Sequence, residues 1–220
     1  MTPQAAVNLI VDTTYFGWKW GVMVLYDAIS KRALSVLEVK NETIERYRQE
    51  VAALQERGVV IQSIICDGRS GLLQAFPGIL VQMCQFHQIK IIVRYLSKKP
   101  KSEAARGLRA LTLTGSSKDR FIKNLHDWLM RHEVFLNERS VNAETGRSHY
   151  THKKLRSAYH SLKRHLPWLF TFEDFPALSI PNTTNLLEGK FGDMKRLLKC
   201  HHGLKKANNI LFVNDYFAKG

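Results

Sequence analysis

The sequence lacks the features that carry a protein into or across a membrane. Its longest apolar run is far below the ~18 residues of a membrane span, and Met1 to Gln4 lack the basic start and apolar middle of a signal peptide. Cysteine is scarce as well: three in 220 residues argue against a disulfide framework and suit a reducing compartment. These absences predict a soluble, cytoplasmic protein that binds no membrane.

Acidic residues are few beside basic ones. The chain has 33 Lys and Arg against 19 Asp and Glu, a net charge of +14, and its pI is about 9.8. Such an excess is typical of nucleic-acid binders, although a solvated basic surface without a partner is the plainer alternative. We therefore favour a nucleic-acid partner and expect no small-molecule substrate.

The order of apolar patterns predicts an α/β protein. Three strands with short connections, an antiparallel meander, come first, at Val7–Asp12, Trp18–Tyr26 and Leu34–Val39. An amphipathic helix (Thr43–Arg57), a strand (Val59–Cys66), a short helix (Ser70–Phe76) and a strand (Ile79–Cys84) follow. The predicted order is thus β-β-β-α-β-α-β, with helical patterns over 86–164 and a last helix from Pro181. We divide the chain into a core (1–97), a helical insertion (98–180) and a C-terminal helix and tail of the core (181–220).

Two of the predicted strands run into an acid. Asp12 follows Leu9-Ile10-Val11, and Asp67 follows Ile64-Ile65-Cys66. A helical crossover returns to the same sheet, so the fourth strand should lie parallel to the first. Because open α/β sheets place their chemistry at the carboxyl ends of strands, Asp12 and Asp67 are expected side by side.

A third acid, Glu188, lies on the last predicted helix. It stands beside an apolar stripe of Leu187, Phe191, Met194 and Leu198, and helical geometry puts Lys195 and Lys199 within about 20° of its direction. Three carboxylates next to cations suit phosphodiester chemistry with Mg²⁺, which prefers oxygen ligands. The residues expected to contact phosphates are Arg69, Lys190, Lys195, Arg196 and Lys199.

Each acid also has an ordinary explanation. Asp12 suits a strand end, Asp67 suits the turn at Asp67-Gly68, and Glu188 suits the positive end of a helix dipole. Taken singly, these readings are the better ones. The metal hypothesis is favoured only by the three acids together with the strand order and the charge.

The motifs around these acids resemble the DDE transposases of bacterial insertion sequences, in the branch related to Mutator-like elements. The resemblance rests on VDTTYFG at Asp12, ICDG at Asp67, TTNLLEGKFGDMKR at Glu188, and the C-x-x-H motif CQFH at Cys84 and His87. It implies a ribonuclease H-like mixed sheet with an all-helical insertion before the last catalytic helix.

The resemblance also implies a function. It implies a polynucleotidyl transferase of a mobile genetic element, which cuts and transfers DNA strands at transposon ends with Mg²⁺, or Mn²⁺ as its substitute. Asp12, Asp67 and Glu188 would be its catalytic residues and metal ligands. The implied partners are transposon ends and target DNA, bound by a homodimer at the bacterial nucleoid.

Two alternatives stay open at this point. One is a ribonuclease H-like nuclease or junction resolvase, and the other is a truncated, catalytically inactive DNA-binding remnant. Members of the resembled family carry an N-terminal domain that recognises transposon ends, whereas the first strand here is expected near Val7. With no groove-reading motif recognisable, we expect DNA binding without sequence preference.

Cys84 and His87 have the spacing of half a zinc site, which Cys200, His201 or His202 would complete. A lone half-site is a weak signal. We favour the other interpretation, in which Cys84 ends a strand, His87 begins a helix, and both have a structural role near the acids.

Overall fold

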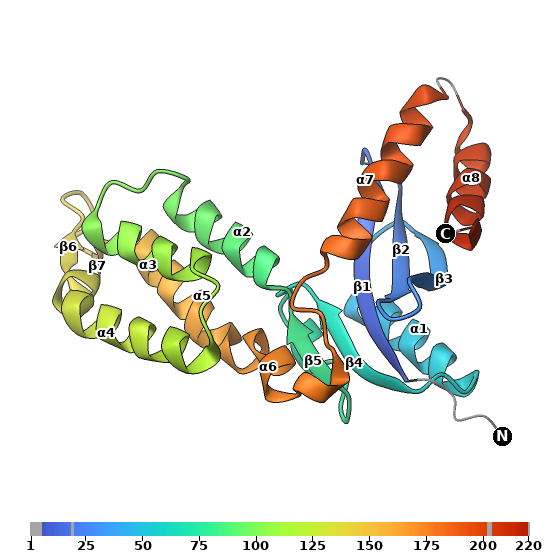
Figure 1. Cartoon of the computed structure of the whole chain (residues 1–220). Helices are drawn as coiled ribbons and strands as arrows, with labels where there is room; N and C mark the ends of the chain where they lie inside the picture. Colours follow the sequence, from blue (N-terminus) through green and yellow to red (C-terminus); the bar gives the residue numbers. More distant parts are fainter. Residues whose placement is uncertain (1–5, 19, 202–203, 220) are drawn as a thin grey trace.

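A five-stranded mixed sheet forms the centre of the computed structural model, which describes residues 6–18, 20–201 and 204–219 (Figure 1). Its strands, in the order β3-β2-β1-β4-β5, are β1 (Val7–Phe16), β2 (Trp20–Asp27), β3 (Arg32–Val39), β4 (Ile61–Cys66) and β5 (Leu80–Met83). The first three pair antiparallel, and β4 is parallel to β1 and β5. This confirms the predicted meander, the crossover and the ribonuclease H-like arrangement.

The alternation of side chains along the strands gives the sheet two buried faces. Leu9 and Val11 belong to a core cluster with helix α1 (Ile44–Glu56), whereas Ile10 belongs to a cluster with helices α7 (Asn185–Cys200) and α8 (Lys206–Lys219). Figure 1 shows α7 and α8 on the opposite side of the sheet from α1. Even-numbered residues of β1 therefore lie toward α7.

Some predicted boundaries were wrong. β1 continues four residues past Asp12 because β2 pairs with it up to Phe16, opposite Trp20. The predicted helix Ser70–Phe76 is only a single 3₁₀ turn, Leu72–Gln74, which follows Gly71 at a φ of +83°, an angle outside the right-handed helix. The predicted second strand begins at Trp20 instead of Trp18, and Lys19 lies outside the described residues.

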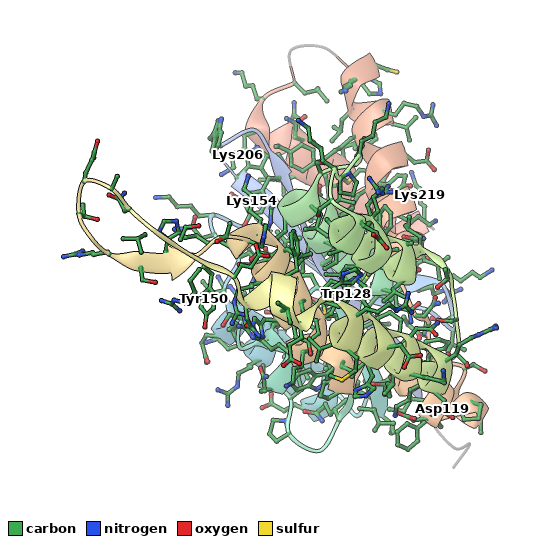
Figure 2. All side chains as sticks on the ribbon, turned by 90° about the vertical axis from the view of Figure 1, so that its left-hand side faces the viewer. Asp119, Trp128, Tyr150, Lys154, Lys206 and Lys219 are labelled. Atoms are coloured by element: carbon green, nitrogen blue, oxygen red, sulfur yellow. The ribbon has the colours of Figure 1, made fainter. Side chains whose placement is uncertain are left out.

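Helices extend from the β5 edge of the sheet (Figure 1). They are α2 (Gln85–Leu96), α3 (Glu103–Leu113), α4 (Lys118–Asn137), α5 (Lys153–Leu169) and the short α6 (Thr171–Asp174), followed by a 3₁₀ turn, Pro176–Leu178. A hairpin of β6 (Arg139–Val141) and β7 (Ser148–Tyr150) interrupts them, so the insertion is mostly helical and not all-helical as expected. Figure 2 looks onto these helices, with Trp128 on α4 near the centre and the hairpin projecting to one side.

Helix α2 packs on α3 and α5, and α5 also contacts β5. The helices α2 to α6, called the helical part below, are thus joined to the sheet at β5. The division of the chain at 97/98 and 180/181 stays a prediction. Within the described ranges, no helix is both long enough and apolar enough to cross a membrane.

Candidate active site

Asp12 and Asp67 lie at the same level along the neighbouring strands β1 and β4. The parallel ladder between β1 and β4 ends with Ile10 opposite Ile65, and each acid lies two residues further along its own chain segment. The sequence had suggested that Asp12 ends its strand, but Asp12 lies inside β1. Asp67 directly follows β4. Since Ile10 packs in the cluster toward α7, the alternation along β1 directs Asp12 to the α7 side, and Asp67 lies next to Asp12 just beyond the end of β4.

Glu188 reaches this side from the first turn of α7. The predicted apolar stripe anchors the helix, with Leu187, Phe191 and Met194 buried against the sheet. A hollow of about 340 Å³ is lined by both Asp12 and Glu188, together with the cations Lys90 and Lys195 and the ring of His87. Asp67 lies beside Asp12 but is not among the residues that line this hollow.

Glu188 is paired with two basic side chains of α2. Lys90 Nζ lies 3.2 Å from Glu188 Oε2, and His87 Nε2 lies 3.6 Å from Glu188 Oε1. Sequence reasoning missed Lys90, although its position three residues after His87 puts it on the same face of the helix.

Asp12 is a carboxyl whose protonation is altered mainly by burial. Its pKa is raised to about 6, first by burial and then by the charges of Glu42 and Asp67. The backbone N–H of Thr13, which donates to Asp12 Oδ1 at 2.8 Å, and the ring of His87 oppose this rise. A cation beside Asp12 would therefore offset the cost of burying its charge.

Glu42 is a fourth acid that the sequence reasoning missed. It lies between β3 and α1, where it pairs with Arg69 and accepts a hydrogen bond of 2.7 Å from Tyr47 Oη. Burial is the main cause of its raised pKa. An acid just before a helix is ordinary in sequence, so no local signal marked its approach to Asp12.

Cys84, His87 and Thr184 tie α2 to the start of α7. Both the backbone N–H and the hydroxyl of Thr184 lie 3.3 Å from Cys84 Sγ, and the same hydroxyl is 3.3 Å from Glu188 Oε1. Burial would raise the pKa of the Cys84 thiol, but hydrogen bonds from His87 and Thr184 outweigh it and lower that pKa. The hydroxyl of Thr184 thus connects this motif to Glu188.

The other zinc candidates do not join this motif. Cys200 and His201 lie at the opposite end of α7, about 24 Å along the helix axis from Thr184. His202 lies outside the described residues. The thiol of Cys200 donates instead to the carbonyl of Arg196 at 3.5 Å.

The five predicted phosphate contacts lie in different surroundings. Lys195 lines the hollow with Asp12 and Glu188, and burial, aided by the charge of Lys199, lowers its pKa. Arg69 pairs with Glu42, and its backbone N–H donates to Asp67 Oδ1 at 3.0 Å. Lys190 lies 5.9 Å from the centre of the Tyr216 ring of α8, and Arg196 pairs with Asp193 at 3.4 Å.

Asp12 and the acids near it carry the type of oxygen ligand that hard divalent cations prefer. Asp12, Asp67, Glu188 and Glu42 offer only carboxylate oxygens, which Mg²⁺ and Mn²⁺ prefer. Their side chains are not grouped as ligands, because no three His, Cys, Asp or Glu residues in the described part of the chain are close enough to hold a metal ion. Glu188 makes its ion pairs with Lys90 and His87 instead.

The sequence pattern described as "Transposase, Mutator family" matches residues 26–202. The chain belongs to this family. The matched stretch of this Mutator-family transposase includes Asp67, the C-x-x-H motif and Glu188, and it begins after Asp12. Membership confirms the family that the motifs had indicated and makes the chain a protein of DNA transposition.

Other comparisons are more distant. One similar solved structure is the HTLV-2 integrase catalytic core domain in complex with magnesium, in dimeric form, with a TM-score of 0.29 and 20% identity over 66% of this chain and 95% of the integrase chain. Another is a chain of the simian T-cell lymphotropic virus intasome in complex with PP2A regulatory subunit B56 gamma, with a TM-score of 0.28, 12% identity, and coverage of 69% and 56%. No curated protein matches the chain.

Proposed function

We propose that this transposase cleaves DNA strands at transposon ends and transfers them to target DNA in a Mg²⁺-dependent reaction. The observation that carries the proposal is that Asp12 and Glu188 line one hollow on the α7 side of the sheet, with Asp67 beside Asp12 at the level where β4 ends. Membership of the Mutator family supports the same activity.

In this proposal Asp12, Asp67 and Glu188 hold the metal. Mg²⁺, or Mn²⁺ in its place, would supply Lewis-acid activation of a phosphodiester. Lys195 lines the hollow beside the acids and binds phosphate oxygens. Cys84 and Thr184 position the first turn of α7, and with it Glu188, against α2.

The proposed partners are transposon ends and target DNA. The net charge of +14 supports a polyanionic partner. We further propose that two copies act together in the DNA complex, because an element has two ends to be cut and joined.

Labelled duplexes that carry candidate element ends test the activity. With Mg²⁺ or Mn²⁺, we expect cleaved and transferred strands, and with chelator neither. Asp12→Asn, Asp67→Asn and Glu188→Gln should each abolish both products while keeping a wild-type melting temperature, because an amide preserves shape but loses the charge that holds a cation. The matched control is Asp127→Asn, which removes a partly exposed carboxylate of α4 that pairs with Lys123, and it should leave the products unchanged.

The same gel separates the alternatives. Cuts without transferred strands would favour a nuclease or resolvase. A band shift with no metal-dependent product would favour a DNA-binding remnant. Substantial cleavage in any one of the three variants would remove that residue from the site.

A further inference from the structure

A second and larger hollow, of about 910 Å³, lies between the loop after β4 and the helical part. Its walls come from residues 68–74, from α2, and from Tyr150 and α5. Among the described residues that line it there is no Asp or Glu, and its charged members are Arg69, Arg94, Lys153, Arg156, Lys163 and Arg164. We call this hollow the basic groove. Its charge suits a polyanion.

Aromatic side chains lie between these cations. Tyr95 of α2, Tyr150 of β7 and Trp168 of α5 line the groove, and each is half-buried. The Arg156 guanidinium stacks 3.6 Å from the centre of the Tyr150 ring, and Figure 2 shows Tyr150 where the hairpin meets the helices. Cations interleaved with aromatic rings are typical of sites that bind single-stranded nucleic acid, since unpaired bases can stack on the rings.

A duplex would use such a groove poorly. The faces of its bases are covered by their neighbours, so only its phosphates could reach the lining. Phosphate contacts need cations but no aromatic rings. The aromatic lining therefore favours an unpaired strand.

The basic groove begins next to the candidate active site. Gly68 and Arg69, which line it, directly follow Asp67. At Gly68 the chain passes so close to β5 and α5 that a Cβ atom would lie 2.3 Å from Met83 Cε of β5 and 3.1 Å from His165 Cε1 of α5. A DNA strand held at Asp67 could thus continue into the groove.

We infer that the basic groove binds an unpaired segment of the DNA strand that is joined to the scissile phosphate. The position of the scissile phosphate rests on the proposed function. The binding of unpaired DNA rests on the lining of the groove alone. The two parts can therefore fail separately.

Binding is measured by fluorescence anisotropy with a labelled single strand of roughly 12 nucleotides, within the range that one single-strand site spans, and with a duplex of equal length. Chelator is present throughout, so the result does not depend on cleavage. The wild-type chain should bind the single strand more tightly than the duplex. The double variant Arg94→Ala/Arg164→Ala should lower the log-log salt slope for the single strand by about 1.4, since each lost phosphate contact is worth about 0.7.

The matched control is Arg120→Ala/Arg131→Ala on α4, which removes the same charge outside the groove. Its slope should stay close to that of the wild type. Trp168→Leu, which keeps apolar packing, should weaken binding of the single strand at least about fivefold and that of the duplex much less. If Trp168→Leu lowers the melting temperature, Tyr95→Leu is the second aromatic variant.

Any of these results would overturn the inference: equal effects of the two double variants, tighter binding of the duplex, or unchanged single-strand affinity in a folded aromatic variant. Tighter binding of RNA of the same sequence would overturn it too. If these tests succeed but the chain gives no metal-dependent products, the inference about the basic groove stands and the proposed function fails.

Discussion

Thr184 shows how a single residue can position an acid, here Glu188, that we propose as catalytic. It is fully buried at the N-terminal end of α7, yet its hydroxyl makes no capping bond to the helix backbone. The hydroxyl lies between Cys84 Sγ and Glu188 Oε1, at 3.3 Å from each. The C-x-x-H motif therefore acts through contacts between α2 and α7, with Thr184 as the link.

The variant Thr184→Val keeps the shape of the side chain but removes these contacts. We expect the free energy of unfolding to fall by about 1–3 kcal/mol, because buried polar groups lose their partners. Strand cleavage should fall further than stability explains, since Glu188 loses a neighbour. Denaturant unfolding and cleavage rates measure the two effects. Thr183→Val, at a less buried position, is the control, and an equal loss in the control would contradict the role given to Thr184.

Among the elements, α5 joins the helical part to the sheet. The carbonyl of Leu169, at the end of α5, accepts hydrogen bonds of 3.0 Å from the side-chain amides of both Gln82 and Gln85. These amides satisfy a carbonyl that the helix end leaves without an intrahelical partner. One turn before Leu169 on α5, His165 Nδ1 lies 2.6 Å from Oε1 of the buried Gln88 of α2.

This junction should make stability depend on pH. Burial lowers the pKa of His165 from its ordinary 6.5, the charge of Arg164 adds to the effect, and Asp67 opposes it. Below about pH 6.5 the unfolded chain takes up a proton that folded His165 accepts only at lower pH, so stability falls as the pH falls. The free energy of unfolding should therefore drop more between about pH 7.5 and pH 5.5 in the wild type than in His165→Gln. Equal drops would show that His165 does not contribute.

Across the whole molecule, basic side chains differ in how close they lie to the three candidate acids and in whether an acidic neighbour pairs with them. Lys195 shares a hollow with Asp12 and Glu188, whereas Arg196, the next residue, pairs with Asp193 and is exposed. Exposed ion pairs contribute little to stability, but a paired cation is less available to a phosphate. The two neighbours should therefore differ in their contribution to DNA binding.

Salt titrations of duplex affinity test this difference. Lys195→Ala should reduce the log-log slope by about 0.9, the value for one phosphate contact on B-DNA, and Arg196→Ala should reduce it less. Chelator removes any contribution of cleavage, and both variants change the net charge equally. Equal slopes for the two variants would mean that proximity to the acids does not select the phosphate contacts.

Local patterns in the sequence were enough to predict the sheet and to single out three acids by their places on the predicted strands and helix. Alternating apolar residues identified the strands, and the crossover rule placed β4 beside β1. The stripe of Leu187, Phe191 and Met194 determined which face of α7 is buried, and hence that Glu188 stands at its margin. These features follow from spacing along the chain, because periodicity and strand connection are local properties.

Only the tertiary structure decided what surrounds those acids. The pairing of Lys90 with Glu188 joins residues 98 positions apart, and the approach of Glu42 to Asp12 depends on how α1 packs under the sheet. The basic groove is assembled from the loop after β4, α2, Tyr150 and α5, none of which carries its whole pattern. The physical reason is the same in each case: contacts between distant segments arise when buried faces pack, and no local spacing in the sequence records which polar residues at their margins will meet.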